Sequence, residues 1–361
     1  MVFDYIDGGA DDEITLAHNE ARFRAIGLLP RALIDVEKID IRTTLMSTPL
    51  ATPIIIAPTA STRLFNPRAG EEAVARAAHS HGTFYSASTL ASTTIEEIAA
   101  TTPGPKLFQI YAWKDRGLIL EILARARDTG FKGIILTVDT PVAGNRERDF
   151  RNDFSIPPKI TWSTATQALG RPGYMFDLAV TPKISAANFT HLRKDVGGIV
   201  DFINEQFDRT VSWRDACWLR ENWDGAFAIK GISHGSDAVR CVEIGADAVW
   251  VSNHGGRQLD TAPATIDLVA EIADVAAGRA EIVMDGGVRR GSDVVKAIAL
   301  GACAVAIGRP YLWGLAAHGE QGVLRAFEIL ESELRRTMAL IGCPMLADLT
   351  PEILRPLLPP R

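Results

Sequence analysis

The sequence contains few cysteines: Cys217, Cys241, Cys303 and Cys343 among 361 residues. Their spacing matches no metal-ligand motif, and three of them lie in or beside apolar segments, where a small buried thiol is expected. We therefore predict no metal site and a reducing, intracellular setting.

The chain also lacks a strong excess of charge and any long apolar run. Its 38 basic and 44 acidic residues give a net charge of −6, so no general basic field favours nucleic acid. No stretch reaches the roughly 18 apolar residues of a membrane-spanning helix, and no signal peptide is recognised. We expect no nucleic-acid partner and a cytoplasmic protein, with a peripheral position at the inner face of the membrane as the alternative.

A repeated unit in the middle of the chain predicts the fold. Each copy has a glycine that ends a helix, a short linker, and an apolar strand ending in a small or hydroxyl residue. Clear copies occupy 130–137, 245–252 and 301–308, and a looser copy occupies 81–86. With 53–58, 106–109, 226–230 and 281–284 they give about eight strands that alternate with helical stretches, one of them over 68–81. This pattern predicts an α/β (β/α)₈ TIM barrel, in which active residues gather at the carboxyl ends of the strands.

Two segments stand outside the repeat. We expect residues 1–361 to form a single domain, with an N-terminal cap over about 1–48. Residues 151–211, after the fourth strand, contain scattered Pro, Gly and Thr and are far longer than an ordinary connection. Such an excursion serves as a lid, an oligomer contact or a membrane-docking segment.

The stretch 249–260, VWVSNHGGRQLD, is the first candidate for chemistry. An apolar strand ends there and is followed by His254, two glycines and Arg257. A histidine beside an arginine, with glycines that let the backbone approach a ligand, suits a base that acts on an anionic substrate. The alternative is a turn with an incidental histidine.

A second ligand signature follows the seventh and eighth strands. It consists of DGGVRRG at 285–291 and IGRP at 307–310. Glycine turns with arginines at this corner of a barrel hold phosphate groups through backbone N–H groups and a helix N-terminus. Asp285 suits a sugar or ribityl hydroxyl. If the glycines formed only tight turns, no phosphate would be needed, but the paired motifs favour one.

Taken together, these motifs resemble the FMN-dependent 2-hydroxy-acid oxidases and dehydrogenases. The resemblance covers nearly the whole chain and is carried by SNHGGRQLD, DGGVRRGSDVVKAIALGA, IGRP, LTVDTP with RERD behind it, FQIY, IKGI, IAPTA and DYIDGGADDEITLAHN. Relative to the pattern of the family, we expect a short helix before Val2 and the heme domain of the cytochrome-fused members to be missing. The resemblance implies FMN, bound without covalent attachment, and oxidation of a 2-hydroxy acid.

The resemblance also implies a catalytic group at the strand ends. His254 would take a proton from the substrate, and Asp139 would hold the imidazole and stabilise its charged form. Tyr111 would contact the substrate hydroxyl. Without its neighbours, Asp139 could equally be a helix cap.

The carboxylate of the substrate would be bound by a second group. Arg146 and Arg257 would supply the planar, bidentate guanidinium geometry, and Tyr5 would add a third donor. Arg146 could instead be one charge of a solvated loop, and Tyr5 a packing residue.

The cofactor contacts implied by the resemblance lie at several strand ends. Lys230 would sit near flavin N1 and O2, where negative charge develops on reduction. The full set is Thr59, Ala60, Ser88, Gln109, Thr137, Lys230, Ser252, Asp285, Gly287, Arg289, Gly308 and Arg309. Lys230 could alternatively be the Schiff-base nucleophile of an aldolase, and a flavoprotein without catalytic activity is a further alternative.

Two substitutions relative to glycolate oxidases predict a large substrate. Leu90 occupies the place of their tryptophan and Ala143 that of their leucine, so we expect a bulky or aromatic (S)-2-hydroxy acid such as mandelate. Ala60 resembles the oxidases, which favours oxygen as acceptor. The alternative is a quinone-linked L-lactate or mandelate dehydrogenase, with membrane contact through 151–211. We expect a homotetramer.

Overall fold

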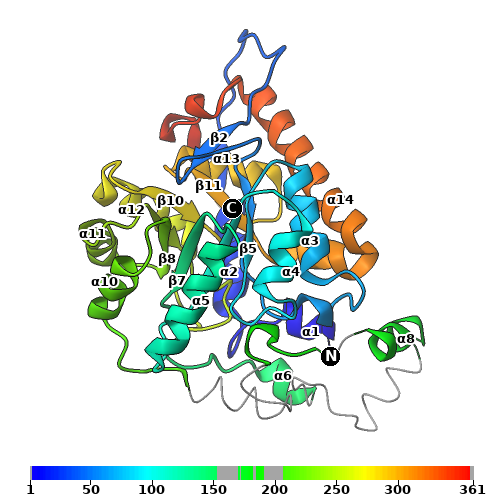
Figure 1. Cartoon of the computed structure of the whole chain (residues 1–361). Coiled ribbons are helices and arrows are strands. Elements are labelled where there is room, and N and C mark those ends of the chain that lie inside the picture. The colour runs from blue at the N-terminus through cyan, green and yellow to red at the C-terminus, as the bar shows by residue number, and fades with distance from the viewer. Residues whose placement is uncertain (1, 153–169, 171, 182–183, 191–205, 358–361) are drawn as a thin grey trace.

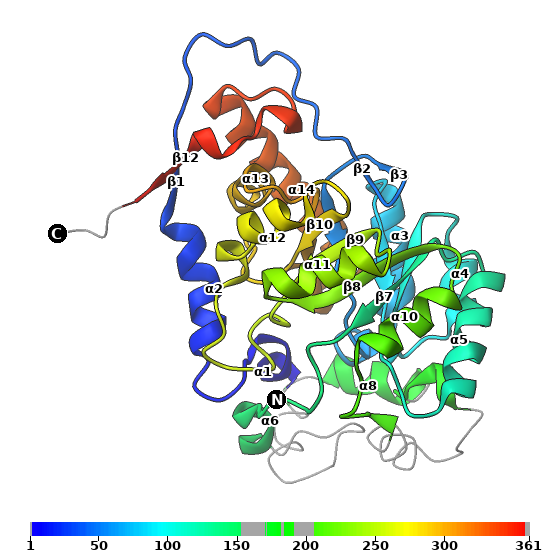
Figure 2. The ribbon, with the colours of Figure 1, turned by 90° about the vertical axis from the view of Figure 1, so that its left-hand side faces the viewer.

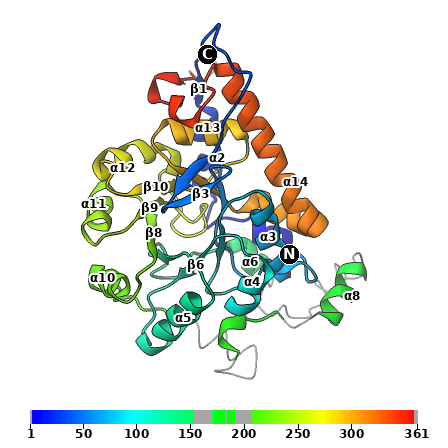
Figure 3. The same cartoon turned by 45° about the horizontal axis from the view of Figure 1, so that its top comes forward.

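The protein folds as a barrel of eight parallel strands (Figures 1 and 3). This computed structural model describes residues 2–152, 170, 172–181, 184–190 and 206–357. The sheet order is β4-β11-β10-β9-β8-β7-β6-β5, and the backbone N–H of Ile56 donates to the carbonyl of Phe84 at 3.1 Å, which joins the two end strands. The predicted (β/α)₈ barrel is therefore confirmed. Its strands are β4 (Ile54–Ile56), β5 (Tyr85–Ala87), β6 (Lys106–Ile110), β7 (Gly133–Thr137), β8 (Ala226–Ile232), β9 (Ala248–Val251), β10 (Glu281–Met284) and β11 (Ala304–Ile307).

Helices surround the strands, as Figure 3 shows. The helix predicted over 68–81 forms with Gly70 as its first residue. The outer helices are α3 (Gly70–Ser80), α4 (Ile95–Thr101), α5 (Arg116–Asp128), α10 (Trp213–Glu221), α11 (Gly235–Glu243), α12 (Val269–Ala276), α13 (Gly291–Ala299) and α14 (Arg309–Ile341). Short 3₁₀ turns are η1 (Thr62–Leu64), η2 (Ala187–Phe189), η3 (Thr265–Asp267), η4 (Leu346–Asp348) and η5 (Pro351–Ile353).

The strands are apolar throughout because side chains on both of their faces are buried. One face packs against the helices. The other contributes to a separate cluster that includes Ile55, Ile135, Trp250 and Val283, together with several alanines. Small residues next to Trp250 leave room for its indole, so the barrel interior is a packed core and not a channel.

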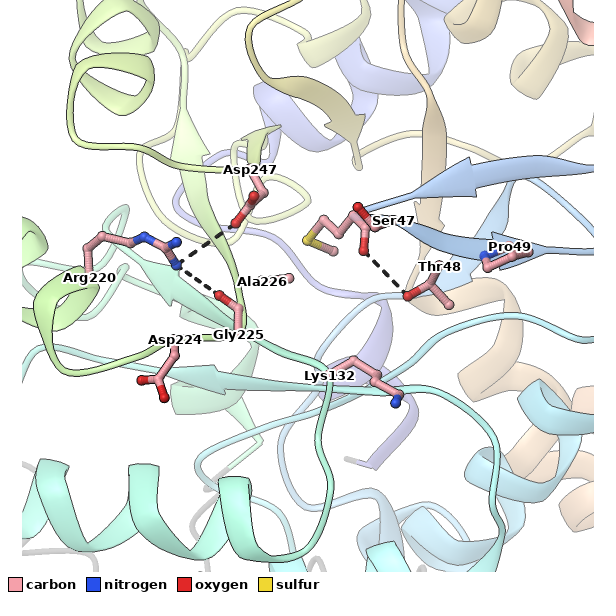
Figure 4. A pocket seen from close by; sticks show the side chains of 10 residues that line it. Ser47, Thr48, Pro49, Lys132, Arg220, Asp224, Gly225, Ala226 and Asp247 are labelled. Carbon is pink, nitrogen blue, oxygen red and sulfur yellow. Dashed lines mark hydrogen bonds and ion pairs between the residues drawn. The ribbon is translucent and has the colours of Figure 1, made fainter.

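A hairpin covers the amino ends of the strands. It is formed by β2 (Thr43–Leu45) and β3 (Thr48–Leu50), and Leu45 and Met46 pack into the interior cluster. A cavity of about 510 Å³ lies beside it (Figure 4), where Arg220 donates to the carbonyl of Gly225 at 2.8 Å and stands 4.0 Å from Asp247. This cavity is at the end of the barrel opposite the polar strand ends.

The structure distributes the predicted N-terminal cap over both ends of the barrel. Helix α1 (Val2–Asp7) lies at the carboxyl ends of the strands, where its backbone contacts Arg257 and Arg309. Helix α2 (Ile14–Arg24) follows, then β1 (Ile26–Leu28) pairs with β12 (Leu354–Pro356). The chain then continues to the hairpin at the other end of the barrel (Figure 2).

Part of the long excursion over 151–211 can be placed. Helices α6 (Glu147–Arg151) and α8 (Pro172–Val180) lie at the same end of the molecule as α1 (Figures 1 and 2). Much of the predicted excursion, including residues 153–169 and 191–205, lies outside the described residues. Within the described ranges, no helix has the length and apolar character needed to cross a membrane.

Gly291 offers a direct test of how the loop after β10 is fixed. A Cβ at this position would lie 2.1 Å from the backbone nitrogen of Leu334 in α14, and backbone atoms cannot move aside cheaply. We expect Gly291→Ala to lower the free energy of unfolding by about 1–3 kcal/mol through overpacking. Gly173→Ala is the control, because nothing lies within 4 Å of its added Cβ. Equal urea midpoints for both variants would contradict this packing.

Candidate active site

A cavity of about 570 Å³ opens at the carboxyl ends of the strands, a volume typical of small-molecule sites. Every residue that the sequence predicts for the site lines this cavity, except Asp139 and Ser252. The lining set from the prediction is Tyr5, Thr59, Ala60, Ser88, Gln109, Tyr111, Thr137, Arg146, Lys230, His254, Arg257, Asp285, Gly287, Arg289, Gly308 and Arg309. Side chains from all parts of the chain thus meet in one place.

His254 is presented to the cavity by a tight coil after β9. Its own φ is 57°, and Gly255 and Gly256 continue at 65° and 75°, which is the left-handed region that glycine adopts readily. The hydroxyl of Ser252 accepts the backbone N–H of His254 at 3.0 Å and fixes the turn. The side chain is 30% exposed, so the ring faces the cavity.

Asp139, which follows β7, orients the imidazole from behind. Its Oδ1 lies 2.8 Å from Nδ1 of His254, so Nε2 is the ring nitrogen that can exchange a proton with a molecule in the cavity. Asp139 can approach β8 this closely only because residue 231 is a glycine. A Cβ on Gly231 would lie 2.7 Å from the Cβ of Asp139. Glycine at this position in β8 therefore allows the pair to form.

Asp139 also faces a lysine. Its Oδ2 lies 3.5 Å from Nζ of Lys230. Burial alone would raise the pKa of Asp139, but the charges of His254 and Lys230 outweigh burial and hold that pKa well below its usual range. Asp139 is consequently an anion that stabilises a charged imidazole.

Lys230 is buried among acceptors at the end of β8. Its Nζ donates to Ser252 Oγ at 2.9 Å and lies 3.6 Å from Asp285. Burial lowers the pKa of Lys230, but Asp139 and Asp285 outweigh it and raise that pKa above its ordinary value. A Schiff-base nucleophile must be a neutral amine, so this environment disfavours the aldolase alternative.

Ser252 was predicted to contact the cofactor, but the structure places it outside the lining of the cavity. Its hydroxyl donates to Asp285 Oδ1 at 2.7 Å while accepting from Lys230. Asp285 also accepts from the indole N–H of Trp250 at 3.0 Å. Ser252 therefore supports the charged residues from behind the cavity wall, and a direct contact with a cofactor stays a prediction.

Two guanidinium groups lie close to the ring of Tyr5. The centroid of that ring is 5.0 Å from Cζ of Arg257 and 5.4 Å from Cζ of Arg146. Arg257 Nη1 donates to the carbonyls of Tyr5 and Gly8 at 2.7 and 2.8 Å, which anchors it to the N-terminal segment. Two cations on one side of a cavity form a suitable clamp for a carboxylate.

Tyr111 stands in the same cavity, with its ring centroid 5.1 Å from that of Phe207. Burial, followed by the nearby Asp139 and Tyr5, raises the pKa of Tyr111 far above its ordinary value. The phenol is therefore protonated at any physiological pH. It can donate a hydrogen bond to a ligand oxygen.

The corner after β10 and β11 carries a dense positive charge. Arg309 donates to the carbonyls of Ile6, Gly8 and Gly255 at 2.9–3.0 Å, and Arg289 pairs with Glu20 at 3.0 Å. Burial, together with Arg257 and Arg289, lowers the pKa of Arg309 to about 9. An anionic ligand would relieve this repulsion, and the start of α14 at Arg309 adds free backbone N–H groups.

Two buried, uncharged polar atoms in the cavity wall lack hydrogen-bond partners. Among the described residues, Gln109 Nε2 and Thr137 Oγ1 make no hydrogen bond, although both residues line the cavity. Unpaired buried polar groups are costly, so a ligand that supplies acceptors or donors there is expected. A flavin ring edge on Gln109 and Thr137, with a phosphate at the arginine corner, fits these residues.

The sequence did not single out Asp149, which the structure places in the clamp. Its Oδ2 lies 2.9 Å from Nε of Arg146, and the two side chains form an ion pair. Nε of Arg146 makes no hydrogen bond within the described residues. Asp149 also lines the cavity. The sequence did offer a signal for this ion pair, because Asp149 follows Arg146 by three residues in the NRERD motif.

Asp149 predicts a pH dependence of anion binding. Burial raises the pKa of Asp149 above that of an ordinary aspartate, although Arg146 and Arg257 oppose this, and Asp4 adds to it. As the pH falls through this raised pKa, the carboxyl loses its charge beside two guanidiniums, so anions bind more tightly. Asp149→Asn should bind a simple 2-oxo acid more tightly at neutral pH and lose this part of the pH dependence in calorimetry.

Asp247→Asn, at the opposite end of the barrel, is the matched control and should behave as the unaltered protein. Weaker anion binding by Asp149→Asn would show that the carboxylate is needed to orient Arg146 and does not compete with the ligand.

Comparison with known proteins agrees with this geometry. A family model described as FMN-dependent dehydrogenase matches residues 1–356. L-lactate oxidase of Nostoc sp. is 44% identical over 353 residues, covering 97% of this chain and 92% of the relative. Glycolate oxidase 1 of Oryza sativa subsp. indica is 43% identical over 350 residues, covering 97% of this chain and 90% of the relative.

A solved structure is similar over the same extent. The monotopic membrane protein (S)-mandelate dehydrogenase superposes with a TM-score of 0.95 at 35% identity, covering 99% of this chain and 95% of that one. The resemblance inferred from the motifs is confirmed, and with it FMN as the cofactor. The chain belongs to the FMN-dependent dehydrogenase family and is an oxidoreductase of the 2-hydroxy-acid oxidase type.

Proposed function

We propose that the protein oxidises a bulky or aromatic (S)-2-hydroxy acid, such as mandelate, to the 2-oxo acid and passes the electrons to oxygen. The observation that carries the proposal is that His254, held by Asp139, lines the same cavity as Arg146 and Arg257. A base and a carboxylate clamp in one cavity are what this reaction requires.

The clamp orients the substrate. Arg146 and Arg257 bind its carboxylate with charge-assisted hydrogen bonds, and the planar guanidinium groups fix its direction. The ring of Tyr5 lies near both arginines, and Tyr5 is proposed as the third donor. Tyr111, kept protonated, donates to an oxygen of the substrate. With its carboxylate held, the hydroxyl-bearing carbon points toward the histidine side of the cavity.

His254 then takes a proton at Nε2. The imidazole becomes charged, and the Asp139 carboxylate on Nδ1 stabilises that charge without itself needing to move. FMN, when bound by residues including Gln109, Thr137, Lys230, Arg289 and Arg309, supplies the acceptor for the two electrons and the second proton. A flavoprotein without activity would not need this complete set of base and clamp residues.

The wall of the cavity favours a large apolar group. Leu90 and Ala143 line it, where bulkier side chains would fill space, and Phe207 and Tyr111 present aromatic surface. Burial of apolar area contributes roughly 0.8 kcal/mol per methylene, and aromatic pairs contribute beyond that. A phenyl ring is therefore better accommodated than the hydrogen of glycolate.

A quinone-linked dehydrogenase at the membrane is the second candidate. Exposed apolar side chains lie on α1, α6 and α8, three helices at the same end of the molecule (Figures 1 and 2): Phe3, Phe150, Met175, Phe176 and Val180. The similar mandelate dehydrogenase is a monotopic membrane protein. Such a protein would be cytoplasmic and peripheral at the inner face of the membrane, reached through the 151–211 segment. Ala60 and the similarity to oxidases support oxygen instead, and a homotetramer remains part of the proposal.

Steady-state kinetics test substrate and acceptor together. We expect kcat/KM to rise from glycolate through lactate to (S)-mandelate, by orders of magnitude overall, with turnover in air. Leu90→Trp should fill the cavity and shift the preference toward glycolate. Glycolate as the best substrate of the unaltered enzyme would contradict the size argument. Turnover with a dye under argon but not with oxygen would favour the quinone-linked candidate.

A further inference from the structure

Glu71 is a fully buried carboxylate for which the proposed reaction has no use. It lies in the first turn of α3 with 0% of its surface exposed. Its Oε1 accepts the backbone N–H groups of Thr62 and Ser92 at 3.0 and 2.8 Å, and the hydroxyls of Ser92 and Thr93 also bond to the carboxylate at 2.8–2.9 Å. A buried carboxylate is costly unless it is saturated by such donors.

The donors come from two different loops. Thr62 belongs to the connection from β4 to α3, whereas Ser92 and Thr93 belong to the connection from β5 to α4. Both connections reach the cavity through Ser61 and Leu90, which line it. The carboxylate thus binds two cavity walls to each other from behind.

The two walls are also joined directly, next to the carboxylate. The backbone N–H and the hydroxyl of Ser61 donate to the carbonyl of Leu90 at 3.1 and 3.3 Å. The backbone N–H of Arg63 donates to Ser92 Oγ at 3.2 Å. Ser61 holds a left-handed φ of 52°, a strained conformation that the surroundings must maintain. Loss of the carboxylate would therefore release Leu90 and Ser61 together.

We propose that Glu71 is a positioning residue that sets the place of Leu90 in the cavity wall and so the size of the 2-hydroxy acid accepted. The inference rests on the proposed function. Glu71 acts only through the two loops, because it does not itself line the cavity. Loss of Glu71 should therefore change the preference of the enzyme between small and bulky 2-hydroxy acids. The change should arise mainly from a higher KM for the bulky acid.

Two substitutions separate positioning from folding. Glu71→Gln keeps an oxygen for the N–H groups of Thr62 and Ser92, and its amide can donate to the two hydroxyls. Glu71→Ala leaves both N–H groups buried without a partner. Val74→Ala is the matched control, since Val74 is equally buried in α3 but packs in the core. Ser92→Ala, which removes one hydroxyl, serves if Glu71→Ala does not fold.

The measurement is the ratio of kcat/KM for (S)-mandelate to that for lactate, alongside the melting temperature. We expect Glu71→Ala to lower this ratio about tenfold, chiefly through KM, with Ser92→Ala shifted in the same direction. Glu71→Gln should restore the ratio, and Val74→Ala should lower the melting temperature alone. An unchanged ratio in Glu71→Ala and Ser92→Ala, or a glutamine variant that behaves like alanine, would overturn the inference.

Failure of the positioning role of Glu71 can be distinguished from failure of the proposed function. Absence of wild-type turnover with every acid in the series would overturn both. Normal wild-type turnover with an unchanged ratio in the variants would overturn the positioning role alone.

Discussion

The site depends on one largely buried carboxylate, Asp139, which is shared between His254 and Lys230. An isolated buried carboxylate would be expensive, and its two cationic partners offset that cost. The partners come from β8 and the loop after β9, and the carboxylate follows β7, so three neighbouring strands must end at the same level. The absence of a side chain at Gly231 allows that approach. Base, counter-ion and buried lysine are therefore one electrostatic unit.

A second constraint is the positive charge around this unit. Arg257 and Arg309 both donate to the carbonyl of Gly8, at 2.8 and 2.9 Å. The N-terminal segment thereby contacts the proposed substrate clamp and the proposed phosphate corner at a single atom. Like charges in a buried place repel, and bound anions neutralise them. The substrate carboxylate and the cofactor phosphate are the two anions that this arrangement suits.

Much of the fold could be predicted because local rules repeat along the sequence. A glycine that ends a helix before an apolar strand, repeated in four copies, indicated the barrel, and barrel geometry then placed His254, Lys230 and Arg309 at one end. The supporting roles of Ser252, Asp149 and Glu71 could not be predicted from the sequence. Each depends on contacts between loops that only the folded chain brings together. For a similar reason, sequence order along residues 1–48 does not say at which end of the barrel each part of that segment packs.

Anaerobic reduction of the bound flavin tests the central claim, that His254 with Asp139 removes the substrate proton. With (S)-mandelate under argon, the unaltered protein should bleach rapidly. His254→Ala should retain FMN but bleach roughly 10²–10⁴ times more slowly, and His18→Ala, which alters an exposed histidine on α2, should match the unaltered protein. Bleaching of His254→Ala at the unaltered rate would contradict the account.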